Sequence, residues 1–156
     1  MTIQLTPVAY VRGGRERPYD DDWADVRAVI EFDASQFSPD SLSGLDEFSH
    51  AEVVFYFDRV GDNAITTDAR HPRGNQDWPR VGIFAQRGKN RPNRLGVSVC
   101  EIVAVNGLTI TVRGLDAVDG TPVLDLKPVM SGFQVRGPLR EPDWAREIMQ
   151  TYWTSA

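Results

Sequence analysis

The amino-acid sequence predicts a mostly β protein that folds as a β-barrel with one or two short helices. Three observations support this prediction: several short runs rich in valine and aromatic residues, Pro/Gly-rich pieces between those runs, and few stretches with helical periodicity. A length of 156 residues is typical of one domain, and 41% hydrophobic residues suffice for a core. We therefore expect residues 1–156 to form a single domain.

Three runs in the first part of the chain have the composition of β-strands. Residues 5–11 are mostly apolar, and residues 26–32 and 51–57 are rich in valine and aromatic side chains. Between the second and third runs, Ser38 and Pro39 predict the start of a short helical turn that stops at Gly44.

The strongest local signal is the pair Asn106 and Gly107. It separates a run over residues 97–105 from residues 108–113, where apolar and polar side chains alternate. Asn-Gly between two such runs predicts a β-hairpin with a type I′ turn, because both central residues of that turn need positive φ.

A helix is expected near the C-terminus, at about residues 142–152, with Pro142 at its start. Trp144, Ile148 and Tyr152 fall at i, i+4 and i+8 and form one apolar stripe. We expect this stripe to pack onto the domain or onto a second subunit.

Composition and motifs exclude several classes of protein. The net charge of −5 argues against a protein whose whole surface coats DNA or anionic membrane. One cysteine excludes an intrachain disulfide, and with two histidines it cannot form a tetrahedral zinc site, so no metal is expected. There is no signal-peptide pattern and no apolar run of membrane-spanning length, which predicts a cytoplasmic protein. Rossmann, P-loop and serine-hydrolase motifs are absent.

The isolated cysteine and histidines favour structural roles. Cys100 lies in a β-rich run, where a buried, unreactive thiol is the usual state. His50, at the entrance to a predicted strand, is more often structural than functional, whereas His71 is compatible with either role.

The segment of residues 70–94 has a local excess of positive charge. It contains seven basic residues and one acid, so it carries +6 while the rest of the chain carries −11. Such a segment can attract a phosphate or carboxylate, or its arginines can pair with acids elsewhere. Charge alone leaves both interpretations open.

Two short segments contain most of the residue types suited to a binding site. In residues 81–99, glycines permit close approach of the backbone and Pro92 stiffens it beside Arg87, Arg91 and Arg94. Arginine forks next to main-chain N–H groups are good receptors for a carboxylate or phosphate. In residues 114–128, a loop and strand carry further charged side chains: Asp116, Asp119, Asp125 and Lys127. Acids in turns are commonly local caps, so a structural role for Asp116 and Asp119 is equally compatible with the sequence.

These segments carry a resemblance to a known family. The patterns R-x-x-x-R-P-N-x-L-G-V-S-V at residues 87–99 and L-D-x-x-D-G-T-P-V-L-D-L-K-P at residues 115–128 resemble the TsaA-like, or TrmO, family, and residues 44–57 match it more weakly. The resemblance implies a single-sheeted β-barrel, usually a homodimer, that binds S-adenosyl-L-methionine without a Rossmann domain. It also implies methylation of N6 of threonylcarbamoyl-adenosine at position 37 of tRNA.

The resemblance also assigns roles to residues. Arg87 and Arg91 are expected to hold the cofactor carboxylate. The adenine is expected to lie against apolar side chains and main-chain groups of Gly96 and Val97. The expected cofactor contacts are Phe57, Asp58, Arg59, Phe84, Arg87, Arg91, Asn93, Leu95, Gly96, Val97, Pro122, Val123, Leu124 and Asp125.

Charge and position suggest the remaining roles. Asp125 would complement the positive sulfonium, and we assign Asp125 and Lys127 as the candidate catalytic residues. Arg73, Lys89 and Arg94 are the candidate RNA contacts, and neither DNA nor a membrane is an expected partner.

Some residues depart from the family pattern and keep other functions open. Gly88 and Lys89 follow the first arginine where the family commonly has Ser-Pro, and Asp58 and Arg59 replace a His-Gln pair. Longer members also carry a C-terminal extension. The alternatives are methyl transfer to a small metabolite, a cofactor-binding sensor without catalysis, and a plain RNA-binding barrel.

Overall fold

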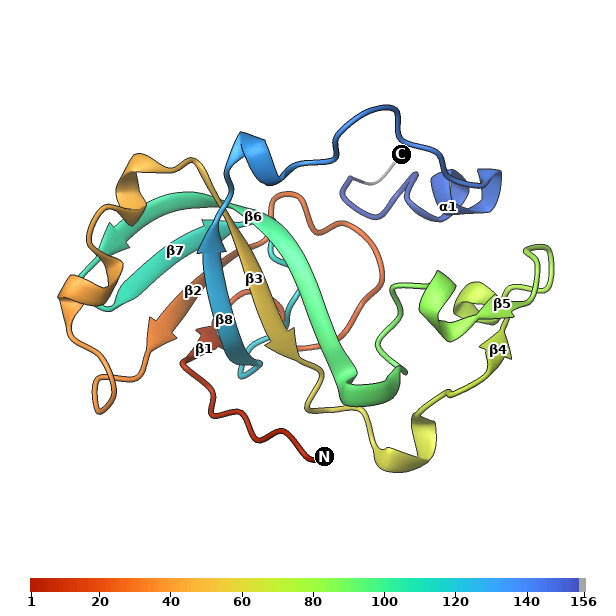
Figure 1. Ribbon diagram of the computed structural model, residues 1–156, viewed down its shortest axis with the longest axis horizontal. Helices are drawn as coiled ribbons and strands as arrows, with labels where there is room; N and C mark the ends of the chain where they lie inside the picture. Colours follow the sequence, from red (N-terminus) through yellow and green to blue (C-terminus); the bar gives the residue numbers. More distant parts are fainter. Residues whose placement is uncertain (155–156) are drawn as a thin grey trace.

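The computed structural model describes residues 1–154, and a closed antiparallel β-barrel dominates it (Figure 1). Around the barrel the strands follow the order β1-β2-β7-β6-β3-β8. Their bounds are β1 Ala9–Arg12, β2 Arg27–Phe32, β3 His50–Tyr56, β6 Leu95–Asn106, β7 Thr109–Arg113 and β8 Pro122–Pro128. The predicted single-sheeted barrel is confirmed. The last two residues of the expected 1–156 domain lie outside the described part of the chain.

Residues 57–94, which we call the lobe, project from one side of the barrel between β3 and β6 (Figure 1). Inside the lobe, β4 Ala69–Arg70 pairs with β5 Val81–Gly82 as a separate small sheet. The 3-10 turns of the chain are η1 Pro39–Leu42, η2 Leu45–Glu47, η3 Asp62–Ala64, η4 Pro72–Gly74, η5 Ile83–Ala85, η6 Pro92–Arg94 and η7 Ser131–Phe133. The predicted turn after Ser38 is therefore present as η1, although the Ser38 side chain does not cap it.

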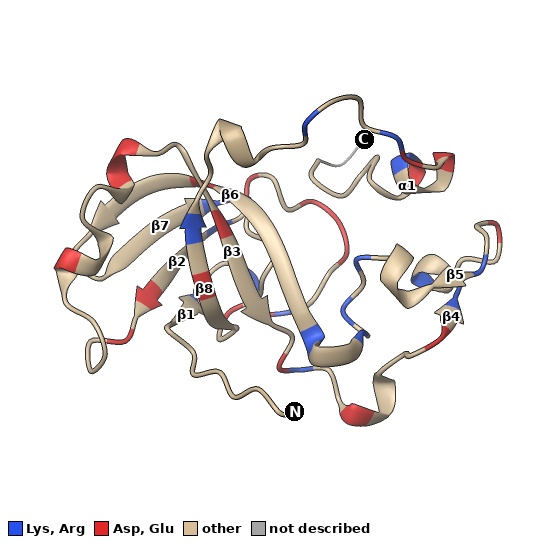
Figure 2. Cartoon of the chain, viewed as in Figure 1, with Lys and Arg blue, Asp and Glu red and all other residues tan. Residues whose placement is uncertain are grey.

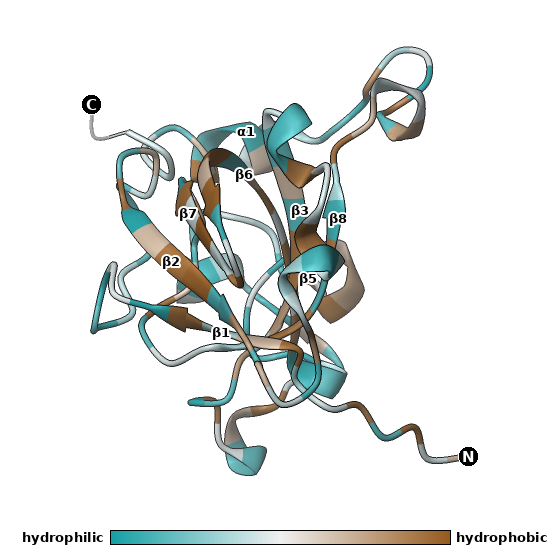
Figure 3. Cartoon of the chain, turned by 90° about the vertical axis from the view of Figure 1, so that its left-hand side faces the viewer, coloured by the Kyte–Doolittle hydropathy of each residue, from teal (hydrophilic) through white to brown (hydrophobic). Residues whose placement is uncertain are grey.

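The core lies inside the barrel, because successive side chains of a strand point to opposite faces and the buried apolar ones face inward. Figure 3 shows hydrophobic residues along the strands of the barrel. Val53 and Phe55 of β3 point inward and are almost completely buried, whereas Val54 between them is only partly buried and Glu52 is exposed. Gly96 on β6 also points inward, where its missing side chain leaves room for the Phe55 ring. Cys100 is buried in the same core, as expected from the sequence.

The hairpin predicted at Asn106 and Gly107 joins β6 and β7, but its turn type differs from the prediction. Asn106 pairs with Thr109, so Gly107 and Leu108 are the central residues of the turn. Only Gly107 of these two has positive φ, at +60°. Glycine at the first central position is typical of a type II′ turn, in which the second residue needs no positive φ.

Two predicted elements are shorter in the structure. The strand expected over residues 5–11 begins only at Ala9, because Pro7 has no N–H to donate and β2 ends at Phe32, the residue opposite Ala9. The C-terminal helix is α1 Asp143–Ile148 rather than residues 142–152. It ends early because residues 151–153 instead form main-chain hydrogen bonds with residues 22–24. Within residues 1–154, no helix is long and apolar enough to cross a membrane.

Candidate functional site

The first half of β6 has an edge that no neighbouring strand covers. β3 pairs along β6 from Leu95 to Glu101, whereas β7 joins the other side of β6 only at Glu101. The main-chain N–H of Phe57 donates to Arg94, and that of Ile102 donates to Ser49, which fixes the alternation of hydrogen bonds between β3 and β6. Leu95, Val97 and Val99 therefore direct their main-chain N–H and C=O groups toward the uncovered edge.

Arg87 lies at this uncovered edge. Its Nη2 donates a hydrogen bond to the carbonyl oxygen of Val97 at 2.6 Å, and the side chain belongs to an exposed residue. The lobe can deliver Arg87 there because Gly88 follows it: a Cβ at Gly88 would collide with the guanidinium of Arg70. The arrangement presents a fixed guanidinium beside main-chain groups, which suits a carboxylate ligand.

Arg91 and Arg94 have mainly structural contacts. Arg91 donates to the carbonyl oxygen of Gln86 at 2.7 Å. Arg94 donates to the hydroxyl of Tyr56 at 2.7 Å and forms an ion pair with Asp62, and its side chain is only 17% exposed. These two arginines fasten the lobe to itself and to the barrel.

The turn before β6 has a strained backbone. Asn93 and Arg94 have φ of +63° and +52°, in the left-handed region that side chains rarely adopt. Two such residues in succession reverse the chain sharply from the lobe into β6, which brings Arg87 back beside Val97.

The outer face of the barrel presents an apolar row next to this edge. Leu95, Val97 and Val99 point outward and each is about two-fifths exposed. In register across the sheet, Val97 lies opposite Val54 of β3, and Val54 lies opposite Asp125 of β8. Asp125 therefore shares this outer face with Val97, two strand spacings away, roughly 10 Å.

The two predicted catalytic residues form a pair on this face. Asp125 accepts a hydrogen bond from Lys127 Nζ at 2.6 Å and from the N–H of Leu126 at 2.9 Å. The hydrogen bond and the charge of Asp125 raise the pKa of Lys127. Lys127 is therefore protonated at neutral pH and cannot accept a proton, whereas it can neutralise and orient Asp125.

Other predicted cofactor contacts contribute to the framework. Val123 is fully buried in the core, and its neighbours on both sides are β1 and β3. The Phe57 ring packs edge-on against Phe55 at 5.3 Å, and Pro122 pairs with Tyr10. In the alternation of hydrogen bonds described above, the main chain of Gly96 pairs with Phe55 of β3. Of Gly96 and Val97, only Val97 therefore directs its N–H and C=O groups to the uncovered edge.

The remaining predicted contacts lie at the surface around the barrel. Leu124 occupies the irregular step in the pairing of β8 with β3, Asp58 is exposed, and Phe84 is 78% exposed on the lobe. Arg59 is also exposed, but it donates to the carbonyl oxygens of Glu16 and Asp119 and so ties two loops together.

The three predicted RNA contacts differ in availability. Arg73 forms an ion pair with Asp21 at 3.0 Å, and Arg94 is held by Asp62. Lys89 is exposed and forms no ion pair with any residue from 1 to 154. The lobe carries both basic and acidic residues (Figure 2), and two of its arginines are neutralised, Arg94 by Asp62 of the lobe itself and Arg73 by Asp21 outside it. His71 has a structural contact, between its Nδ1 and the carbonyl oxygen of Trp78 at 2.7 Å.

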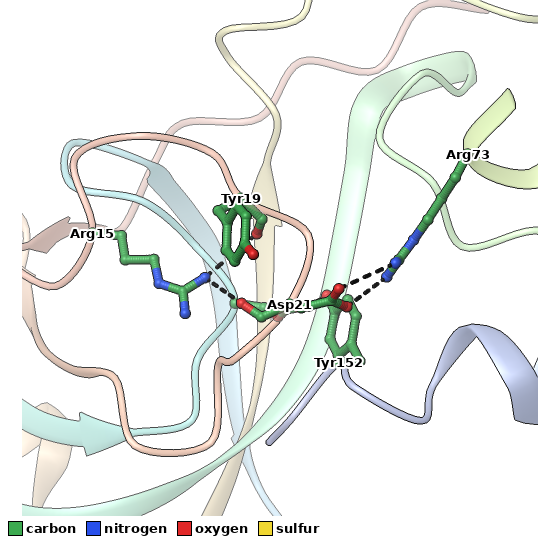
Figure 4. A network of polar contacts seen from close by, with 6 residues as sticks. Arg15, Tyr19, Asp21, Arg73 and Tyr152 are labelled. Atoms are coloured by element: carbon green, nitrogen blue, oxygen red, sulfur yellow. Dashed lines mark hydrogen bonds and ion pairs between the residues drawn. The ribbon is translucent and has the colours of Figure 1, made fainter. Parts of the chain in front are cut away.

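Sequence reasoning missed the contact that the C-terminal segment makes with Asp116. Residues 151–153 hydrogen-bond with residues 22–24, and the Tyr152 hydroxyl then donates to Asp116 Oδ2. Figure 4 shows the guanidinium of Arg73, from the lobe, directed at the carboxylate of Asp21. Burial and the negative charge of Asp116 raise the pKa of Tyr152. The helical stripe that included Tyr152 pointed to packing but not to this partner.

A shallow hollow of about 370 Å³ adjoins the uncovered part of β6. Val99 and Glu101 form one side of it, while Gly114 and the C-terminal Trp153 form another. The C-terminal segment therefore shapes the surface next to the β6 edge.

The family model and the relatives that match this chain point to the same family of proteins. The family model described as tRNA-methyltransferase O N-terminal domain matches residues 15–135. A mouse tRNA (adenine(37)-N6)-methyltransferase is 37% identical over 93 residues, which cover 60% of this chain and 21% of that protein. A probable S-adenosyl-L-methionine-binding protein of Archaeoglobus fulgidus is 30% identical over 135 residues, covering 84% of this chain and 35% of its own length.

The fold comparison agrees. The crystal structure of TrmO from Pseudomonas aeruginosa superposes with a TM-score of 0.72 and 25% identity, over 90% of this chain and 62% of that one. The chain spans about a fifth of the mouse relative and about a third of the archaeal one. Because the family model covers most of the chain and includes both sequence blocks, this protein belongs to the family of the tRNA-methyltransferase O N-terminal domain.

Proposed function

We propose that this protein is an S-adenosyl-L-methionine-dependent methyltransferase that modifies N6 of threonylcarbamoyl-adenosine at position 37 of tRNA. The observation that carries the proposal is Arg87, fixed on the Val97 carbonyl at the uncovered edge of β6. Relatives named as tRNA (adenine(37)-N6)-methyltransferases support the reaction class.

The residues at this edge fit S-adenosyl-L-methionine. The free guanidinium nitrogens of Arg87 suit its carboxylate, and the main chain of Val97 can hydrogen-bond with an adenine edge. The outward side chains of Leu95 and Val97 provide an apolar surface for the adenine ring, and Asp125 places negative charge on the same face. When bound, S-adenosyl-L-methionine supplies an electrophilic methyl group.

The contribution of the chain to catalysis is positioning and electrostatics. Arg87 fixes one end of the ligand, and the apolar row orients its base. The carboxylate of Asp125, held by Lys127 and by the Leu126 N–H, would complement positive charge near the reacting centre. In this proposal Asp125 acts as an electrostatic residue, and Lys127 positions it.

We further propose that two copies of the chain associate as a homodimer and that the substrate is held by the lobe. Val99 and Val103, farther along β6 than the side chains proposed to hold the adenine, are exposed and give a second subunit an apolar surface to cover. Lys89, exposed at the tip of the turn next to Arg87, is available for a phosphate. Action on tRNA would also agree with the cytoplasmic location expected from the sequence.

The proposal can be tested by incubating the protein with labelled S-adenosyl-L-methionine and total tRNA from a strain that lacks this enzyme. We expect label in tRNA, and after nuclease digestion in the threonylcarbamoyl-adenosine nucleoside. Transfer to unmodified adenosine at position 37 would change the substrate, and transfer only to small molecules would replace the tRNA reaction by a metabolite methyltransferase. Cofactor binding without any transfer would indicate a sensor.

A further inference from the structure

Asp116, in the loop between β7 and β8, has a carboxylate whose two oxygens differ in their contacts. Oδ2 accepts the hydrogen bond of the Tyr152 hydroxyl. Oδ1 is buried and has no hydrogen-bond partner among residues 1–154. Leaving a buried carboxylate oxygen without a donor is costly, so such a group calls for a partner that the chain itself does not provide. The carboxylate therefore has capacity for a further donor.

The charges around Tyr152 complement a zwitterion. The hollow beside the uncovered edge of β6 is lined by Val99 and by Gly114, two residues before Asp116, so Asp116 lies near the edge at which Arg87 is held. Arg87 lowers the pKa of Tyr152 against the larger effects of burial and of Asp116, which agrees with this placement. Arg87 is also the residue at the uncovered edge of β6. A carboxylate and an arginine on one side of a site match the ammonium and carboxylate of an α-amino acid.

The residue that covers Asp116 belongs to a lightly attached segment. Residues 130–143 are all exposed, and α1 contains no buried residue. Residues 143–153 are held by three main-chain hydrogen bonds to residues 22–24, by Trp78 Nε1 on Glu147 at 2.7 Å, and by Tyr152 on Asp116. Segments with few buried contacts open at low free-energy cost without global unfolding. Tyr152 can therefore leave Asp116 while the barrel stays folded.

We propose that Asp116 binds the α-ammonium group of the methionine part of S-adenosyl-L-methionine, next to Arg87 on its carboxylate. The Tyr152 hydroxyl occupies the carboxylate until the ammonium replaces it. The inference rests on the proposed cofactor, and it names the residues that bind the amino-acid end of that ligand. It also gives a role to the C-terminal segment, which lies beyond the residues that match the family model.

The test is calorimetric binding of three probes: S-adenosyl-L-methionine, S-adenosylhomocysteine, and methylthioadenosine, which lacks the amino-acid part. Asp116→Asn keeps the shape but removes the charge, so it should weaken the first two roughly 10- to 100-fold and leave methylthioadenosine unchanged. Tyr152→Phe removes the competing hydroxyl and should tighten the first two roughly 2- to 10-fold. Matched controls are Asp46→Asn and Tyr19→Phe, both at exposed residues, which should change none of the three affinities.

A measurement on the unaltered protein keeps the proposal testable if Asp116→Asn does not fold. The deaminated analogue of the cofactor, which lacks only the amine, should then bind roughly 10- to 100-fold more weakly than the cofactor itself. Equal affinity for these two ligands would overturn the assignment while cofactor binding stands. So would an equal loss of affinity for all three probes in Asp116→Asn. If the unaltered protein binds none of the probes, the proposed function fails, and this assignment fails with it.

Discussion

Replacing Gly96 by alanine should destabilise the protein, because the new methyl group would enter space already filled by Phe55. An ideal Cβ at Gly96 lies 2.6 Å from Cζ and 2.9 Å from Cδ2 of that ring, closer than real side-chain contacts. The ring is 2% exposed and packs edge-on against Phe57 at 5.3 Å, so it has little freedom to move aside. The φ of Gly96 is not positive, so the predicted cost comes from packing rather than from backbone strain.

The expected size follows from overpacking of a rigid core, which costs about 1–3 kcal/mol. For a chain of this length, each kcal/mol lowers Tm by about 2–4 °C. Gly82→Ala is the matched control, because nothing lies within 4 Å of its Cβ position and its φ of −59° suits alanine. That control should be neutral or slightly stabilising, by up to about 1 kcal/mol.

Urea unfolding of both variants measures the free energies, and a double variant identifies the cause. Phe55→Leu alone leaves a cavity and destabilises the barrel, but combined with Gly96→Ala it makes room for the methyl group. The two changes should therefore cost less together than the sum of their separate costs. Native stability of Gly96→Ala, or strict additivity with Phe55→Leu, would refute the packing argument.

Three further outcomes are expected. Arg87→Ala should weaken S-adenosyl-L-methionine binding roughly 10- to 100-fold, whereas Arg73→Ala, which breaks an ion pair with Asp21, should change it little; equal effects by calorimetry would mean that only net charge matters. Lys89→Glu should weaken tRNA binding and reduce the log–log salt slope by about 0.7 or more in filter binding, while cofactor affinity stays unchanged; an unchanged slope would remove Lys89 from the RNA contacts. Burial and the charge of Asp116 raise the pKa of Cys100 to about 12, so the folded state keeps a thiol proton that the unfolded chain loses above about pH 8.5. Its contribution to the free energy of unfolding should fall by up to about 1.4 kcal/mol per pH unit above that value, and alkaline urea titrations of Cys100→Ala should lack this decline.

Features with short-range sequence signals could be predicted. The alternation around Asn106 and Gly107 identified the hairpin of β6 and β7, and the valine-rich run identified β3. The blocks at residues 87–99 and 115–128, through their family resemblance, indicated that the barrel closes. Arg87 was selected from that resemblance and from its place beside a rigid turn, and it is the arginine that lies at the β6 edge.

Contacts between distant parts of the chain could not be predicted in the same way. No local pattern indicates that Asp62 pairs with Arg94, that Asp21 pairs with Arg73, or that Tyr152 reaches Asp116. Helical periodicity suggested a longer C-terminal helix, because periodicity does not register hydrogen bonds to a partner segment at the other end of the chain. The position of residues 22–24 decided where that helix ends.

The register of β3 and β6 has a consequence for how this molecule can change over time. Tyr56 ends β3 directly opposite Leu95 at the start of β6, so the whole lobe forms the loop of a single hairpin. Extending a two-residue loop to this length costs only about 2–3 kcal/mol of chain entropy, since the cost grows with the logarithm of loop length. Segments of the lobe other than the one that carries Arg87 can therefore be lengthened, shortened or exchanged while the barrel keeps its register and Arg87 keeps its place at the edge of β6.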